Sequence, residues 1–272
     1  MTEPIRSTSF ADAHAAWHAQ VEAARVAPYG PLSVTALHWL TATPTVLPGL
    51  PGTWSADVDG VATAVLTESD GVSRDGESLS GEVRIGPLTG IESTTVVWGE
   101  IQIEVAARSG ALVVRPRDPA AQDRIDYAGT NTFPADERWA VTARFAPAEP
   151  HIVEVGSAAG EGRTQHYDSA GSAEFEIDGR PVALTLFGSP EAGNLRALFA
   201  DATGGDLTYP AVRFVGAQVI DADTVRIDFN RATNPPCAYS DAATCPFPPT
   251  ENRLDVRIEA GELRPGVALS GA

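Results

Sequence analysis

The sequence contains no lysine, so all 19 of its basic side chains are arginines. Schiff-base catalysis, a Ser-Lys dyad and a phosphate-loop lysine are therefore excluded. The 272 residues also carry 36 acidic side chains and a net charge of -17, which opposes binding to nucleic acid or to an anionic membrane surface. We expect neither partner, and arginine must supply any recognition of anions.

Long apolar runs and a leader-like amino terminus are also missing. No stretch of 18 apolar residues occurs, and residues 1–27 have no apolar run behind a basic segment. Two cysteines are too few for a disulfide-built secreted scaffold. These features predict a cytoplasmic protein that is stabilised by its hydrophobic core.

The usual catalytic and cofactor motifs are incomplete. Residues 71–75 (GVSRD) lack the last glycine of a nucleophile elbow, and residues 160–165 (GEGRTQ) lack the last glycine of a dinucleotide fingerprint. We therefore predict no nicotinamide cofactor and no nucleotide bound through a P-loop. The sequence leaves open whether the protein is an enzyme, and it does not indicate an oligomeric state.

The amino-terminal segment has the pattern of an amphipathic helix. Ser9 and Asp12 resemble a capping box, and apolar residues recur at helical spacing over residues 10–24. The helix is expected to end near Pro28. Ser33 is then expected to cap a second, short helix that reaches residue 40.

A polar stripe runs along the predicted first helix. His14, His18 and Glu22 follow each other at intervals of four residues, a spacing that can place metal ligands on one helix face. Ala15 stands where a helical metalloprotease motif would have glutamate. We interpret the stripe as a solvated boundary of the apolar face and predict no metal site.

After residue 40, short apolar strands alternate with turn residues. Asp59-Gly60, Gly99-Glu100 and Ser109-Gly110 separate strands in the manner of hairpins. A second set of strands is expected at 139–145, 152–155, 173–177, 182–186, 211–215, 224–229 and 254–258. The pattern predicts a mainly β fold with two β-sandwich or partly closed barrel modules, preceded by an N-terminal helix. We assign residues 1–30 to the helix, 31–120 to an N-terminal β module and 121–272 to a C-terminal β module.

Residues 230–253 (NRATNPPCAYSDAATCPFPPTENR) fit neither a helix nor a central strand, because five prolines interrupt them. Irregular segments of this length inside a domain are commonly functional or disordered. Tyr239, Phe247 and both cysteines distinguish this segment from a disordered one. Its prolines lower the entropy cost of ordering the chain, so we expect an ordered segment that holds its side chains in fixed positions.

The carboxy-terminal part contains several specific motifs. They are DFNR at 228–231, NPPCAY at 234–239, TCP at 244–246, ENRL at 251–254 and EAGE at 259–262, with FADATG at 199–204 and TYPAVRF at 208–214 upstream. Together these motifs closely resemble an uncharacterised prokaryotic family, domain of unknown function 1684. The resemblance is strong from about residue 196 and implies a predominantly β fold. It implies no reaction.

The arginines of this region form one candidate site. Guanidinium groups bind carboxylates and phosphates through paired hydrogen bonds. The candidate ligand-binding residues for a small anionic metabolite are Tyr209, Arg213, Asn230, Arg231, Asn234 and Arg253. The competing interpretation is that the arginines pair with carboxylates of the protein itself, such as Asp201 or Asp241.

A thiol-dependent enzyme is the second hypothesis. Cys237 would be the nucleophile or redox thiol and Cys245 its resolving partner, with Asp228 and Glu251 as candidate acid–base groups. Two buried thiols, a disulfide and a zinc site are the other interpretations, and zinc is disfavoured because no histidine lies nearby in the sequence. A third hypothesis is a structural or protein-interaction module, which would show an apolar surface patch.

Overall fold

The structure, a computed structural model, describes residues 9–157 and 162–269. The chain divides into two compact units. We call the first the barrel unit (Met1–Ala23, Ala128–Ala238 and Cys245–Ala272) and the second the sandwich unit (Ala24–Tyr127 and Tyr239–Thr244). The division into residues 1–30, 31–120 and 121–272 stays a prediction.

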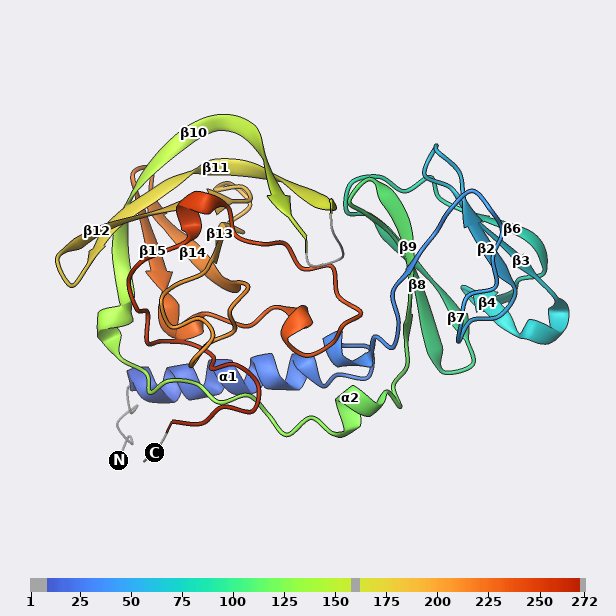
Figure 1. The fold of residues 1–272 in the computed structure, drawn as a ribbon, viewed down its shortest axis with the longest axis horizontal. Helices are drawn as coiled ribbons and strands as arrows, with labels where there is room; N and C mark the ends of the chain where they lie inside the picture. The colour runs from blue at the N-terminus through green and yellow to red at the C-terminus, as the bar shows by residue number, and fades with distance from the viewer. Residues whose placement is uncertain (1–8, 158–161, 270–272) are drawn as a thin grey trace, which may run out of the picture. The chain divides into compact units, whose positions relative to one another are not determined.

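The barrel unit is built on six strands that close in the order β10-β11-β12-β13-β14-β15. These strands are β10 (Ala140–Gly156), β11 (Thr164–Ile177), β12 (Arg180–Phe187), β13 (Arg196–Phe199), β14 (Arg213–Asp221) and β15 (Thr224–Asp228). All neighbours are antiparallel, and β15 closes the ring by pairing with β10 (Figure 1). Alternate residues, such as Val182, Leu184 and Leu186 of β12, fill the core, because successive side chains of a strand face opposite sides.

One long helix accompanies the barrel. Helix α1 (Phe10–Arg25) is capped by the preceding Ser9. The Ser9 Oγ accepts the Asp12 N–H at 3.1 Å and donates to the Asp12 carboxylate at 2.7 Å. The helix ends at Arg25, ahead of Pro28. The predicted cap and helix are confirmed.

The sandwich unit contains two antiparallel sheets. The larger sheet has the order β1-β9-β8-β7-β4-β5, with β1 (His38–Trp39), β4 (Val72–Arg74), β5 (Glu77–Ser78), β7 (Ser93–Trp98), β8 (Ile101–Arg108) and β9 (Ala111–Arg117). The smaller sheet has the order β2-β3-β6, with β2 (Thr53–Ala56), β3 (Ala62–Leu66) and β6 (Gly81–Ile85). Trp54 and Ile85 of the smaller sheet share one hydrophobic core with Val72, Ile103 and Val114 of the larger sheet. A short helix, α2 (Gln122–Ile125), follows the larger sheet in the chain.

The mainly β fold is therefore confirmed, and so are the three hairpins. Two local predictions were wrong. The expected helix from Ser33 to residue 40 is a 3-10 turn, Pro31–Ser33, followed by β1, because His38 pairs with Val114 of β9. No strand forms at 254–258, since the closed barrel leaves no free edge for another strand, and Val256 and Ile258 instead join the barrel core.

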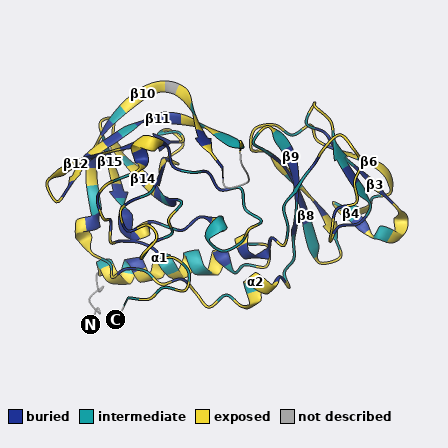
Figure 2. Ribbon diagram, in the orientation of Figure 1, coloured by how far each residue is buried: buried dark blue, intermediate teal, exposed yellow. Residues whose placement is uncertain are grey.

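Residues 229–263 form an irregular segment, many of whose residues are buried (Figure 2). The segment has three single 3-10 turns, at Phe229–Arg231, Pro236–Ala238 and Thr250–Asn252. Its backbone bonds to the barrel, for example from the Phe247 N–H to the Gly156 carbonyl at 2.7 Å. Single 3-10 turns also occur at Glu68–Asp70 and Glu137–Trp139. Among the described residues no helix is both long and apolar enough to cross a membrane.

Candidate functional site

Arg213 lies in the core of the barrel unit. Its guanidinium donates to the Asp201 carboxylate at 2.8 Å and to the carbonyls of Ile258 and Ala260, and its side chain is 1% exposed. Burial lowers the pKa of Arg213, and the Asp201 charge opposes this effect. These contacts are the internal pairing that competes with anion binding.

The other two candidate arginines lie in a different environment. Arg231 is exposed, lies 3.4 Å from the Asp228 carboxylate and stacks over the Trp17 ring with 5.8 Å to the centroid. Arg253 is also exposed. One buried and two exposed arginines do not share one environment, so the predicted arginine site for a small anion stays a prediction.

The two candidate asparagines, in contrast, hold the irregular segment together. Asn230 is 1% exposed; its Oδ1 accepts the Asp136 N–H at 3.0 Å and its Nδ2 donates to Asp228 at 2.8 Å. The Asn234 amide donates to the Leu263 carbonyl at 2.7 Å. A third asparagine, Asn252, also links the irregular segment to the barrel, although sequence patterns did not single it out. Its side-chain amide hydrogen-bonds to the backbone of Thr185 and of Leu198.

Of the remaining predicted residues, Tyr209, Cys237 and Cys245 lie together. Glu251 is exposed and accepts the Thr185 hydroxyl at 3.2 Å. The two cysteines of the described chain are thiols and not a disulfide, and the Cys237 N–H donates to Cys245 Sγ at 3.2 Å. The Tyr209 hydroxyl donates to the Cys237 carbonyl at 3.0 Å.

Part of the polar stripe of α1 faces the protein, so its interpretation as a solvated boundary was wrong for His14. His14 is 8% exposed, and its Nε2 lies 2.9 Å from the Asn230 carbonyl. His18 and Glu22 are half-buried, whereas Ala24 of the expected apolar face is exposed. The physical reason is that the Asn230 carbonyl of the irregular segment lies against this face and provides a partner for the His14 imidazole.

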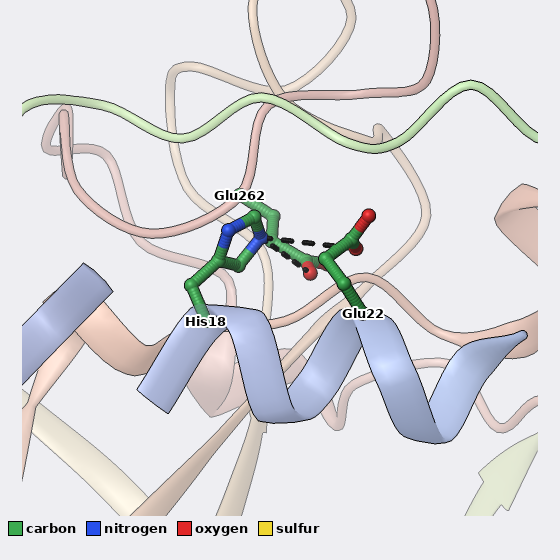
Figure 3. Close-up of side chains that lie close together, drawn as sticks. All are labelled: His18, Glu22 and Glu262. Atoms are coloured by element: carbon green, nitrogen blue, oxygen red, sulfur yellow. Dashed lines mark ion pairs between the residues drawn. The ribbon is translucent and has the colours of Figure 1, made fainter. Parts of the chain in front are cut away.

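The stripe and the irregular segment together form a cluster that sequence patterns did not indicate (Figure 3). His18 and Glu22 point from α1 toward Glu262, which belongs to the irregular segment. His18 Nε2 lies 3.8 Å from Glu22 Oε1 and 3.5 Å from Glu262 Oε1. One donor atom from each residue lies within 4.8 Å of the other two.

Each carboxylate of the cluster also accepts a hydrogen bond from a backbone N–H group. Glu22 Oε2 accepts the Thr130 N–H at 3.2 Å, and Glu262 Oε2 accepts the Asn234 N–H at 2.7 Å. The other oxygen of each carboxylate is the one that faces His18. The side chains of His18 and Glu22 are 18% and 22% exposed, whereas Glu262 is fully buried. Glu262 is therefore the buried member of the cluster, and the side chains of His18 and Glu22 are partly exposed to solvent.

Gly261 explains how Glu262 reaches this position. Its φ is +78°, and a Cβ there would lie 2.6 Å from the Ala232 carbonyl oxygen. Only glycine allows this turn and close approach, which brings the Glu262 N–H to the same carbonyl at 2.9 Å. The glycine before an acid in the EAGE motif was the available sequence signal for this residue.

The barrel unit also has an open groove, at the start of α1. Phe10, Phe133, Asp136, Arg138, Trp139 and Leu207 are among the residues that line it. Arg138 pairs with Asp136 at 3.1 Å and stacks on Trp139, so its charge is already engaged. The groove contains none of the predicted ligand-binding residues.

Comparison with known proteins gives the family. A family model described as a protein of unknown function, DUF1684, matches residues 125–263, which is half of the chain. The chain belongs to this family, as the motifs implied. It is also similar, at 32% identity and a TM-score of 0.43, to the solution NMR structure of an uncharacterized protein of Haloarcula marismortui, covering 52% of this chain and 78% of that one. No curated protein matches the chain.

Proposed function

We propose that the barrel unit binds a divalent metal ion on His18, Glu22 and Glu262. The observation that carries this proposal is the convergence of three donor atoms within 4.8 Å from two segments far apart in the sequence. His18 Nε2 is buried and makes no hydrogen bond among the described residues. A buried ring nitrogen between two carboxylates, without a hydrogen bond, is positioned to donate its lone pair to a cation.

The distances support a metal ion over a direct ion pair. Hydrogen bonds between nitrogen and oxygen span about 2.7–3.2 Å. The separations of 3.5 and 3.8 Å from His18 Nε2 are longer than that. Ligands held at about 2.0–2.2 Å by one tetrahedral ion lie roughly 3.4 Å from each other. The two distances from His18 Nε2 are therefore close to those within a coordination shell.

The donor set favours a first-row ion such as Zn²⁺, Mn²⁺ or Co²⁺. One imidazole with two carboxylates combines a nitrogen ligand, which suits these ions, with hard oxygen ligands. Three protein ligands leave a further coordination position, as in sites that take a water or a substrate. In our proposal a small carboxylate or phosphate occupies that position, which is a different site from the predicted arginine site.

Isothermal titration of the full chain, first dialysed against a chelator, tests the ion. With Zn²⁺ or Mn²⁺ at physiological salt, which weakens diffuse binding to the acidic surface, we expect one ion per chain. His18→Ala should lower the affinity roughly ten-fold or more. His166→Ala is the matched control, because His166 also lies beside a glutamate, Glu154, at 3.0 Å, but on the exposed barrel surface. Unchanged affinity in His18→Ala, or no stoichiometric binding by the wild type, would overturn the proposal.

The visible spectrum of the Co²⁺-loaded protein tests the open position. Co²⁺ in a site of low coordination number absorbs visible light, and an added ligand changes the band. We expect acetate to change the spectrum of the wild type. A spectrum that stays unchanged at saturating acetate would contradict anion binding at the ion. Binding of the ion itself is tested separately by the titration.

A further inference from the structure

The two cysteines of the chain form a second constellation in the barrel unit, separate from the proposed metal site. Cys237 lies in the 3-10 turn Pro236–Ala238, and Cys245 lies next to Pro246. The backbone N–H of Cys237 donates to Cys245 Sγ at 3.2 Å. The irregular segment therefore brings the sulfur of Cys245 to the backbone of Cys237.

The two thiols differ in exposure. Cys245 is 5% exposed, whereas Cys237 is half-buried. We therefore expect a reagent in solution to reach Cys237 before Cys245. This is the arrangement of an attacking thiol with a resolving thiol.

The surroundings of Cys237 favour its thiolate. A hydrogen bond from the Cys245 thiol, and then one from the Tyr209 hydroxyl, lower the pKa of Cys237 against the opposing effect of burial. The thiolate is the nucleophilic form of cysteine. The Tyr209 hydroxyl lies 3.0 Å from the Cys237 carbonyl, so its single proton is shared between this carbonyl and the thiolate.

We propose that Cys237 is a site of oxidation by hydroperoxides and that Cys245 resolves the product to an intramolecular disulfide. The Cys237 thiolate attacks a peroxide oxygen, the O–O bond breaks, and the leaving alkoxide or hydroxide takes up a proton, which leaves a sulfenic acid. The Cys245 thiol then attacks this sulfur, the S–O bond breaks and water leaves. In total, two thiols and one hydroperoxide give a disulfide, an alcohol or water, and one water.

Treatment of the full chain with hydrogen peroxide, followed by mass spectrometry, tests the proposal. We expect the intact protein to lose two hydrogen atoms and to regain them with a dithiol reductant, and peptide mapping should join Cys237 to Cys245. Cys245→Ser should accumulate a sulfenic acid on Cys237 that dimedone labels. Cys237→Ser should give neither the disulfide nor the label.

Three outcomes would overturn the proposal. One is oxidation of Cys237→Ser at the wild-type rate, another is a folded Cys245→Ser that dimedone never labels, and the third is a wild type that peroxide leaves as two thiols. Alanine variants at the same positions, checked by circular dichroism, separate these outcomes from misfolding. Tyr209→Phe should react more slowly than the wild type, because the thiolate loses one hydrogen bond.

Discussion

Each unit places a glutamate against cationic or basic groups, but the two units do so at different distances. In the sandwich unit, Glu104 accepts hydrogen bonds from Arg115 at 2.8 Å and from Arg117 at 2.8 and 3.1 Å. In the barrel unit, His18 stands 3.5 and 3.8 Å from its two glutamates. The first cluster is closed by hydrogen bonds, and the second leaves room between its donor atoms.

The difference separates a structural ion cluster from a candidate ligand site. Burial alone would raise the pKa of Glu104, but Arg115 and then Arg117 outweigh it and hold this pKa below its ordinary value. The Glu104 charge is thus satisfied by the protein itself. The barrel unit can also build closed pairs, since Arg213 and Asp201 meet at 2.8 Å. Its open spacing at His18 is therefore a local property of that cluster.

The largest effect is expected from breaking the closed pair of the barrel. Asp201→Asn should lower the free energy of unfolding by about 3–5 kcal/mol, because it leaves the buried Arg213 charge without its counter-ion. The Asp201 carboxylate also accepts the Ile258 N–H at 2.8 Å. Urea denaturation measures the change.

Asp206→Asn is the control for this comparison. Asp206 pairs with Arg257 at 3.2 Å, but both side chains are exposed. Exposed ion pairs contribute little to the free energy of unfolding, so this variant should unfold at the same urea concentration as the wild type. If both substitutions had equal effects, burial of the Arg213 pair would not be what stabilises the barrel.

A smaller loss is expected in the sandwich unit. Glu104→Gln should cost about 2 kcal/mol near neutral pH, since hydrogen bonds to a charged group are weakened. The folded-state pKa of Glu104 is lowered, so its contribution is complete above the ordinary value of 4.5, and it is lost as the pH falls below that value and through the lower folded-state pKa. The stability difference between wild type and variant should therefore be constant near neutral pH and shrink as the pH falls below 4.5. A difference that stays constant during this fall in pH would show that shape, and not charge, explains the loss.

The cluster of Glu104 with Arg115 and Arg117 could be predicted from the sequence, because its residues lie on one hairpin. The turn at Ser109-Gly110 sets the hairpin register, and that register places Glu104 directly opposite Arg115. The hairpin itself was predicted, and counting outward from the turn gives the pair. The same local reasoning located α1 from its cap.

The open cluster was not accessible in this way. His18 and Glu22 come from the first helix and Glu262 from near the end of the chain, and no periodicity relates them. Helical spacing alone placed His18 on a solvated stripe, because the pattern could not show that a polar irregular segment covers it. Pattern reasoning also failed at 254–258, where apolar residues fill a barrel that six other strands have closed.

The smallest change in the free energy of unfolding among the three cluster variants is expected for His18→Leu in the presence of a chelator. His18 Nε2 makes no hydrogen bond among the described residues, so its removal should change the free energy of unfolding by about 1 kcal/mol or less. Saturating Zn²⁺ should stabilise the wild type, since an ion that binds only the folded state adds to its stability, and should leave His18→Leu unchanged. A loss in chelator as large as that of Glu104→Gln would instead identify a protonated His18 as an internal counter-ion. The two clusters would then differ in distance but not in kind.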